Sequence, residues 1–456
     1  MLDRFAAAGG SFARRVRSAA DVTRHTLRIR TSAPVFSGRL TPDAAKEEFS
    51  ARRPILERVL FENILAFWDP RVVDNENGGY RLNHDHRGIW LGPSAKRLIT
   101  QARVTWFYSR LANSAYATRD HLAIARHGYE FMTTHLWDRD AGGFFWEVDP
   151  AGAVTVDEKQ MMAQAFALFA LAEYALASDD PRPIALAGEL FDLMTTHARD
   201  EVNGGYHEFF SVDWTEREHG VALDRDSAHK TLDTHLHLLE ALTGYIRVNN
   251  TGEVRRQLEE LIRLIARTTV DERVSAGGEI FHADWSPVDS PLGRRVSYGH
   301  ETERIWMLAD ACEAVGAPNR VFVDLYAAIF ASVLQYGYDV GDGGYYAAGP
   351  LGRVARNRAK LWWPQAEGLL CCLVLYKLTG DPIYAQCFAH TLDWTIDRQI
   401  DWEHGDWHEH VSPDGTAKGI KAGPWKTPYH NGRAMIACLE GLDVDGEPPL
   451  PLRITR

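Results

Sequence analysis

The tripeptide Gly78-Gly79-Tyr80 is the first copy of a motif that recurs along this chain of 456 residues. Further copies follow at intervals of 62 to 73 residues. They are Gly142-Gly143-Phe144, Gly204-Gly205-Tyr206, Gly277-Gly278-Glu279 with its aromatic residue delayed to Phe281, Gly343-Gly344-Tyr345 and the degenerate Gly405-Asp406-Trp407. Self-similarity at a fixed period is the signature of a repeat architecture. The sequence therefore predicts six copies of one structural unit.

Each unit has the same predicted order of elements. The motif is followed by a short aromatic stretch and a turn, such as Asp149-Pro150-Ala151-Gly152, which predicts a small β-hairpin. An apolar helix follows, as at residues 161–171, and a more polar amphipathic helix, as at residues 183–198, precedes the next motif. We predict an all-α fold, an (α/α)6 barrel with six inner helices, six outer helices and short β-hairpins at the active-site end.

A polar residue stands near the start of every apolar helix. In chain order these residues are Gln101, Gln164, His235, His300, Gln365 and His430. Solvent exposure explains them poorly, because the helices around them are apolar on all sides. If the helices form an inner ring, the six side chains converge at one rim. A concave site with a few convergent polar groups is the usual form of a ligand site, so we expect a polar pit there.

Three histidines, His237, His300 and His430, lie in this ring or beside it. Arg103 and Glu367 hold the place of His237 in their own repeats. Two carboxylates, Glu240 and Glu303, follow His237 and His300 by three residues. Residues three apart share a helix face, so each carboxylate is expected to orient its histidine and raise the basicity of the ring.

Other interpretations of these residues remain open. A single histidine on an apolar helix is most often a core residue satisfied by a neighbour. A zinc site is a second alternative, although the histidines come from separate repeats and no close pair such as His-Glu-x-x-His is present. Tryptophans precede two helix starts, at Trp362-Trp363-Pro364 and at Trp425, where flat rings suit sugars; barrel packing is the alternative.

The composition argues against several classes of protein. The formal net charge of −12 disfavours a nucleic-acid partner, which usually requires a basic face. No apolar run approaches the ~18 residues that span a bilayer, so no membrane association is expected. The five cysteines show no disulfide or metal spacing, which favours reduced core residues in a cytoplasmic protein.

One domain is expected between two tails. Residues 1–45 are rich in arginine and lack the apolar segment of a secretory signal, which predicts a flexible basic extension; a transit segment is the lesser alternative. Residues 46–445 should form the single catalytic barrel, and residues 446–456 a C-terminal tail. The protein is expected to be a monomer or a homodimer.

Five segments resemble the N-acylglucosamine 2-epimerase family, and the cellobiose 2-epimerases within it more than the N-acyl sugar enzymes. They are Gln101-Ala102-Arg103, residues 230–241, residues 297–303, residues 362–367 and residues 425–433. In order they span nearly the whole chain except the N-terminal extension, and together they are highly specific. The resemblance implies the (α/α)6 barrel and a sugar 2-epimerase that needs no cofactor or metal and acts on a free mono- or disaccharide.

The resemblance also implies a role for each residue. In the family's chemistry the sugar ring opens, a proton leaves carbon 2, and a proton returns to the resulting cis-enediolate on the opposite face. His300 and His430 would be the acid/base pair, because inversion through a planar intermediate needs such groups on both faces. His237 would assist ring opening, and Arg103 would stabilise the enediolate oxygen. The implied substrate-binding residues are Asp233, Glu303, Trp362, Trp363, Glu367 and Trp425.

The chain departs from the cellobiose enzymes at four positions. Asp233 replaces the usual Asn, Met162 replaces a Tyr, Thr427 replaces a Cys, and Glu301 replaces an Asp. These changes bear on the sugar more than on the reaction. The expected substrate is a cellobiose-type β-1,4-disaccharide, or mannose and glucose. The alternatives are an aldose–ketose isomerase for mannose and fructose, a glycoside hydrolase with two carboxylates, and a non-catalytic binding barrel.

Overall fold

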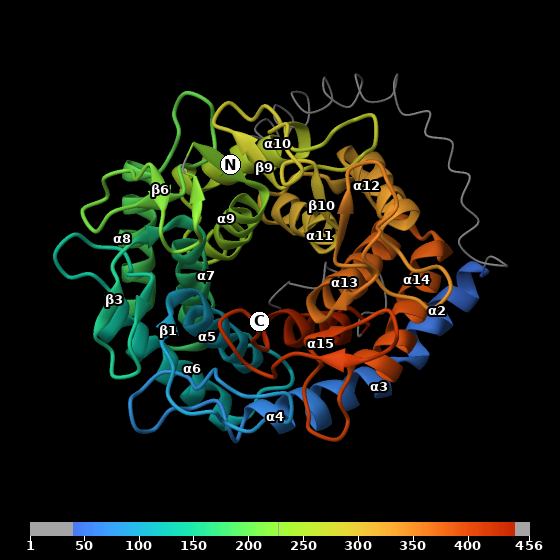
Figure 1. The fold of residues 1–456 in the computed structure, drawn as a ribbon, viewed down its shortest axis with the longest axis horizontal. Helices are drawn as coiled ribbons and strands as arrows, with labels where there is room; N and C mark the ends of the chain where they lie inside the picture. The colour runs from blue at the N-terminus through green and yellow to red at the C-terminus, as the bar shows by residue number, and fades with distance from the viewer. Residues whose placement is uncertain (1–39, 227, 443–456) are drawn as a thin grey trace, which may run out of the picture.

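The structure is a computed structural model that describes residues 40–226 and 228–442. Six helices form a closed inner ring, in which each helix packs against the next and the last packs against the first (Figure 1). They are α5 (Leu98–Ala112), α7 (Met161–Ala177), α9 (Leu232–Tyr245), α11 (Tyr298–Ala314), α13 (Trp362–Thr379) and α15 (Tyr429–Leu442). Every residue of α5 from Leu98 to Leu111 is buried, which explains why the inner helices are apolar on all sides.

Outer helical segments surround this ring and keep one solvated face (Figure 1). In α10 the buried residues Val254, Leu258, Leu261 and Ile265 recur every three or four positions, the spacing of one helix face. The segments are α3 (Arg53–Arg58) with the π-helical turn Val59–Leu65 and α4 (Ala66–Trp68), α6 (Arg119–Phe131) with the π-helical turn Met132–Leu136, α8 (Arg182–His197), α10 (Gly252–Arg267), α12 (Val323–Tyr336) after the 3₁₀ turn Asn319–Val321, and α14 (Pro382–Trp394) with the π-helical turn Thr395–Gln399. The predicted (α/α)6 barrel is confirmed.

Short antiparallel strands join neighbouring repeats where the inner helices begin. The strand before an inner helix pairs with a hairpin strand of the next repeat, as β4 does with β5. The His84 N–H donates to the Ala422 carbonyl at 3.0 Å and so connects the first repeat to the last. The strands are β1 (Lys96–Arg97), β2 (Glu147–Val148), β3 (Val154–Val156), β4 (Lys159–Gln160), β5 (Phe209–Phe210), β6 (His219–Gly220), β7 (Arg225–Asp226), β8 (His229–Thr231), β9 (Ile280–His282), β10 (Arg295–Ser297), β11 (Ala348–Pro350), β12 (Lys360–Leu361), β13 (His410–Val411) and β14 (Ala417–Lys418).

The glycine turns are fixed to the inner helices by one repeated hydrogen bond. The Tyr80 N–H donates to Gln101 Oε1 at 2.9 Å. The same bond joins Phe144 to Gln164 at 2.9 Å, Tyr206 to His235 at 3.0 Å and Tyr345 to Gln365 at 2.8 Å. The prediction that Gln101, Gln164, His235 and Gln365 line a ligand pit is therefore wrong. A buried N–H must find an acceptor, and these four side chains supply it.

His300 and His430 do not belong to that set, although the sequence aligned them with it. In their helices the next residue contacts the turn. The Gly277 N–H donates to Glu301 Oε1 at 3.1 Å, and Asn431 Nδ2 donates to Asp406 Oδ1 at 2.6 Å. The two histidines therefore sit one residue before the position that binds the turn, on a different side of the helix. The departure at Glu301 has a structural role in this turn.

The fourth turn is shifted by two residues from its predicted place at Gly277-Gly278. The Ser275 N–H donates to the Asp271 carbonyl, the bond that Gly78 makes to Asp74 in the first repeat. Ser275 also takes the left-handed backbone, with φ of 52°. Gly277 stands where the other turns carry an aromatic residue, because an added Cβ there would come within 1.9 Å of the Thr269 carbonyl oxygen and 2.6 Å of Arg304 Nη2.

Most of the glycine turns are also stabilised by a buried ion pair between an aspartate of the turn and a lysine. The Lys96 ammonium lies 2.8 Å from Asp74 Oδ2, and Asp74 Oδ1 accepts the N–H groups of Glu76 and Asn77. Equivalent pairs are Lys159 with Asp138, Lys230 with Asp200, Lys360 with Asp339, and Lys421 with Asp401. The carboxylate is thus shared between the turn backbone and the lysine that precedes the inner helix.

The packed domain begins before residue 46, where the sequence placed its boundary. Helix α2 (Pro42–Ala51) packs against α14 and buries Ala45 and Phe49. Most of the predicted extension, residues 1–39, and the segment 443–456 lie outside the described residues. Among the helices of the described part, none is long and apolar enough to cross a membrane.

The Tyr206 turn offers a test of the turn-holding bond. Gly204 and Gly205 both have φ of 75°, but an added Cβ on Gly204 meets nothing within 4 Å, whereas one on Gly205 comes within 2.8 Å of His235 Nε2. We expect Gly204→Ala to cost about 1–2 kcal/mol of unfolding free energy from backbone strain. Gly205→Ala should cost a further ~1–3 kcal/mol, because it also displaces the His235 acceptor. Chemical denaturation measures both, and equal losses would contradict the account.

Candidate functional site

The polar residues that meet near the starts of the inner helices come from two helix positions. One lies immediately before the turn-binding residue and the other two residues after it, so they are three apart and share a helix face. The first position carries His300 and His430 in α11 and α15. The second carries Arg103, His237, Glu303, Glu367 and Arg433. With Asp233, Glu240, Glu279 and Trp363, these residues are called the central site below.

His300 is held between two carboxylates. Its Nδ1 lies 2.6 Å from Glu279 Oε2, and its Nε2 lies 3.6 Å from Asp233 Oδ1. Burial disfavours the imidazolium, but Glu279, Asp233 and Glu303 outweigh it and raise the pKa of His300 to about 10. The ring is therefore a cation at neutral pH. Glu279 was missed by the sequence analysis, because it lies in the hairpin before β9 rather than on a helix.

His237 shares one of these carboxylates. Its Nε2 lies 3.4 Å from Asp233 Oδ1 and its Nδ1 lies 3.2 Å from Glu240 Oε2, so the predicted pairing with Glu240 is confirmed. Burial lowers the pKa of His237, but hydrogen bonds to Asp233 and Glu240 reverse the effect and raise it overall. Asp233 thus lies within ion-pair distance of two imidazoles.

His430 has the opposite electrostatic character. Its Nδ1 lies 2.7 Å from Glu367 Oε1, which leaves Nε2 as its free nitrogen. Burial, together with the charges of Arg103 and Arg433, holds the pKa of His430 well below its ordinary value of 6.5. His430 is neutral at the pH where His300 is charged. One base and one acid are therefore present at the same time.

Arg433 connects the carboxylates of the central site. Its guanidinium contacts Glu240, lies 2.6 Å from Glu367 Oε1, and lies 3.3 Å from Glu303 Oε1. Glu303 therefore contacts Arg433 and His430, so the prediction that it orients His300 is wrong, whereas the prediction that its charge raises the pKa of His300 is confirmed. Arg433 was not predicted as a site residue, yet it occupies the same helical position as Arg103, and that equivalence would have revealed it.

Arg103 is a buried cation without a contacting carboxylate among the described residues. Its guanidinium carbon lies 4.3 Å from the centre of the Phe166 ring, and Nη1 donates to the Trp425 carbonyl at 3.5 Å. Its Nε has no hydrogen-bond partner. Burial lowers the pKa of this guanidinium, but the group stays charged at neutral pH. Unpaired donors beside the histidines suit a ligand oxygen that carries negative charge.

The three predicted tryptophans occupy different environments. The Trp363 ring lies 5.1 Å from the His300 ring and 5.5 Å from the His430 ring, so it contacts both imidazoles. Trp425 is 40% exposed at the edge of the site, where a sugar ring can stack. Trp362 is only 5% exposed, and Lys426 lies over its face. Barrel packing, and not stacking at the rim, is therefore the role of Trp362.

A metal ion does not fit the carboxylates of the central site. Ligand atoms of Glu303, Glu367 and His430 lie within 4.8 Å of one another. Arg433 already contacts both of these glutamates, and its fixed positive charge would oppose a metal cation. The cluster is a buried ion-pair network with its own cation.

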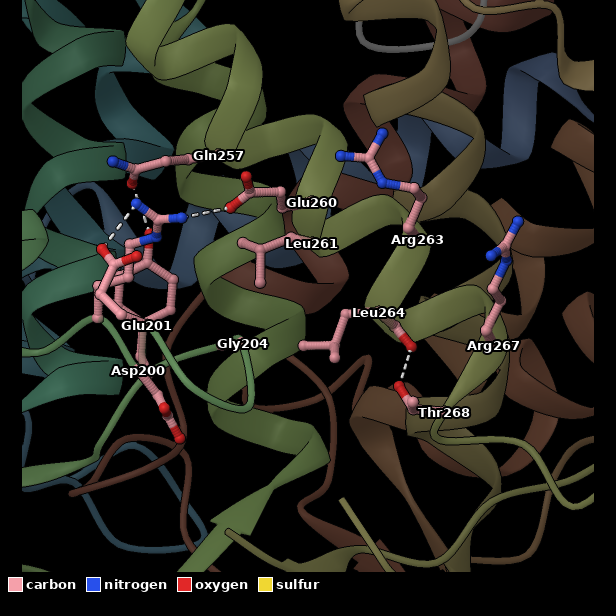
Figure 2. A pocket seen from close by; sticks show the side chains of 13 residues that line it. Asp200, Glu201, Gly204, Gln257, Glu260, Leu261, Arg263, Leu264, Arg267 and Thr268 are labelled. Atoms are coloured by element: carbon pink, nitrogen blue, oxygen red, sulfur yellow. Dashed lines mark hydrogen bonds and ion pairs between the residues drawn. The ribbon is translucent and has the colours of Figure 1, made fainter. Parts of the chain in front are cut away.

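A pocket of about 370 Å³ lies elsewhere, on the outer wall between α10 and the Gly204 turn (Figure 2). Its walls include Glu260, Arg263 and Arg267 of α10 and Glu201 of the turn. No residue of the central site lines it. Its charges are partly compensated, since Arg199 lies 2.9 Å from both Glu201 and Glu260.

The sequence and the fold have counterparts among known proteins. The model of the N-acylglucosamine 2-epimerase family matches residues 78–434. The cellobiose 2-epimerase of Bacteroides fragilis is 30% identical, over 84% of this chain and 97% of its own length. The structure of the cellobiose 2-epimerase from Bacillus thermoamylovorans superimposes with a TM-score of 0.78 at 28% identity, over 86% of this chain and 99% of that one. A D-mannose isomerase structure shares the fold, with a TM-score of 0.75 at 21% identity over 86% of this chain and 98% of that one.

Removing Arg433 should destabilise the domain, because three buried carboxylates lose their common cation. We expect Arg433→Met to lower the free energy of unfolding by about 3–5 kcal/mol. Arg256→Met removes an arginine that is 52% exposed and paired with Glu253, and should cost less than about 1 kcal/mol. Urea titrations of both variants measure the difference. Equal stability of Arg433→Met and the parent protein would contradict the role of Arg433.

Proposed function

The chain belongs to the N-acylglucosamine 2-epimerase family, and from this membership and the central site we propose that it is a cofactor-independent sugar 2-epimerase. The observation that carries the proposal is the placement of two imidazoles against one tryptophan in different electrostatic surroundings: the carboxylates beside His300 favour its cation, whereas burial and two arginines favour neutral His430. Inversion at a carbon through a planar intermediate needs a base on one face and an acid on the other.

The reaction follows from these protonation states. His430 Nε2 accepts the proton from carbon 2 of the ring-opened sugar, while Nδ1–H stays bonded to Glu367. The electrons of the broken C–H bond move to the carbonyl oxygen at carbon 1, giving the cis-enediolate, and Arg103 stabilises that oxygen. His300 then returns its Nε2 proton to the opposite face of carbon 2. Hydrogen bonds to Asp233 and Glu240 raise the pKa of His237 against the effect of burial and so favour its protonated form, which would assist ring opening by donating to a sugar oxygen.

The proposed substrate is the reducing sugar of a cellobiose-type β-1,4-disaccharide, or free glucose and mannose. A second sugar unit would extend away from the histidines toward the half-exposed Trp425. Aromatic faces at the mouth of a site favour sugar rings, whose C–H faces are apolar. The similarity to cellobiose 2-epimerases supports the same choice.

The remaining candidates have less support. An aldose–ketose isomerase would use the same groups but return the proton to carbon 1, and the mannose isomerase structure is too distant in sequence to favour that outcome. A glycoside hydrolase needs two carboxylates free to reach the glycosidic bond. Glu303 and Glu367 are nearly inaccessible to solvent and are bound to Arg433. A non-catalytic barrel would not need an imidazole pair of opposite charge.

Heavy-water exchange separates these candidates. Incubation with cellobiose, glucose or mannose in D2O should place deuterium at carbon 2 and produce the 2-epimer, because the returned proton equilibrates with solvent. Deuterium at carbon 1 with ketose formation would identify the isomerase instead. His300→Asn should slow epimerisation by about 10²–10⁴-fold. His219→Asn, which changes a half-exposed histidine in a hairpin, should not. An active parent protein without carbon-bound exchange would contradict the mechanism.

The pH profile of kcat/KM should be broad. His430 must be neutral to accept a proton, and its pKa lies well below 6.5, so activity falls only in clearly acidic solution. His300 must be protonated to donate, and its pKa is about 10, so activity falls on the alkaline side only near that pH. Initial rates measured from about pH 5 to pH 10.5 should form a plateau through neutrality. An acid limb centred at the ordinary histidine pKa would contradict the assignment.

A further inference from the structure

Asp233 is the carboxylate of the central site that lies within ion-pair distance of two histidines. It lies in the first turn of α9, four residues before His237. Its Oδ1 lies 3.4 Å from His237 Nε2 and 3.6 Å from His300 Nε2. Its side chain is 21% exposed, so it also faces the space that a substrate would enter.

A carboxylate and an amide have different effects at this place. An amide stabilises a neutral or a charged imidazole by a hydrogen bond alone. A carboxylate adds a full negative charge within ~4 Å, which favours the imidazolium form of both rings. The position of Asp233 beside Nε2 matters, because Nε2 is the nitrogen of His300 that is not already bonded to Glu279.

The charges that face His300 come from every helix around it. Asp233 and His237 lie on α9, Glu301 and Glu303 on α11, and Glu279 in the hairpin before β9. Glu367 on α13, His430 and Arg433 on α15, and Arg103 on α5 complete the set. Arg225 on β7 acts on Asp233 from the rim. Three glutamates, Glu240, Glu303 and Glu367, are bound to Arg433. The carboxylates within ion-pair distance of His300 are those of Asp233 and Glu279.

We propose that Asp233 is a positioning residue that keeps His300 protonated, so that the free protein holds its acid at His300 and its base at His430. The catalytic consequence rests on the proposed function, but the protonation of His300 does not. Asp233 acts through the two histidines. It needs no contact with the reacting carbon.

Each turnover reverses the protonation states of His300 and His430. One inversion moves a proton from carbon 2 to His430 and another from His300 to carbon 2, so the protein is left with His430 charged and His300 neutral. No net proton is gained or lost. Asp233 and Glu279 disfavour that product state, because both face a neutral His300. His430 then releases its proton to solvent and His300 takes one up, which restores the starting state.

Histidine NMR tests the proposal without any substrate. The protein is labelled with ¹³C at histidine Cε1, the His300 and His237 signals are assigned by His300→Asn and His237→Asn, and the signals are followed from about pH 5 to pH 10.5. His300 should titrate near pH 10 in the parent protein. In Asp233→Asn its midpoint should fall by about 1–3 pH units, and the His237 midpoint should also fall.

Two further variants serve as controls. Glu279→Gln removes the other carboxylate beside His300 and should lower the His300 midpoint but leave His237 nearly unchanged. Asp224→Asn removes an exposed carboxylate that pairs with His219, and should move neither. An unchanged His300 midpoint in Asp233→Asn, or a parent protein in which His300 titrates near its ordinary pKa, would overturn the proposal.

The same variants distinguish this proposal from the proposed function. If Asp233→Asn shifts the NMR midpoints and the parent protein exchanges no proton of any sugar tested, Asp233 keeps its role and the epimerase assignment fails. If the parent protein epimerises a sugar and Asp233→Asn leaves the NMR midpoints unchanged, the epimerase assignment stands and the role proposed for Asp233 fails. When both are right, the alkaline limb of kcat/KM in Asp233→Asn moves to lower pH with the His300 midpoint, whereas a residue that only binds sugar would change KM alone.

Discussion

A side-chain acceptor buried near the start of an inner helix takes the N–H of a glycine turn, and the geometry of the central site depends on that bond. It recurs in Gln101, Gln164, His235 and Gln365 at 2.8 to 3.0 Å, and Glu301 takes its place in the fourth repeat. The bond fixes the rotation of each helix about its axis. The residues one before and two after the acceptor must then face the centre of the ring. The repeated turn bond therefore positions the residues of the central site, although the side chains that make this bond are not part of that site.

The charges at the centre are arranged so that two similar side chains differ in function. Arg433 gathers Glu240, Glu303 and Glu367, and with Arg103 it makes the surroundings of His430 positive. Asp233 and Glu279 make the surroundings of His300 negative. Burial disfavours the charged form of both rings, so it adds to the effect of the arginines on His430 and opposes the effect of the carboxylates on His300. The two imidazoles are chemically identical, so the charged groups around each ring determine which one acts as the acid and which one as the base.

The sequence predicted the barrel, its six units and the three histidines, because these depend on periodicity and on residues within one helix. It failed where side chains on different elements meet. Glu279 reaches His300 from a hairpin 21 residues earlier, and Glu303 turns to Arg433 on another helix instead of to His300 three residues before it. The fourth turn misled the alignment because the glycine pair there follows the turn instead of forming it, and the Thr269 carbonyl leaves no room for a side chain at Gly277.

The central claim is that His300 and His430 serve opposite faces of carbon 2. Deuterium exchange by single-histidine variants tests it most directly, with each purified epimer followed separately in D2O. When one histidine is replaced by asparagine, the other can still remove and return a proton on its own face at a pH where its ring is neutral. His300→Asn should therefore exchange the carbon 2 proton of one epimer at neutral pH without inverting it, and His430→Asn should exchange that of the other epimer only as the pH approaches about 10, where His300 loses its proton. Exchange of the same epimer by both variants would contradict it.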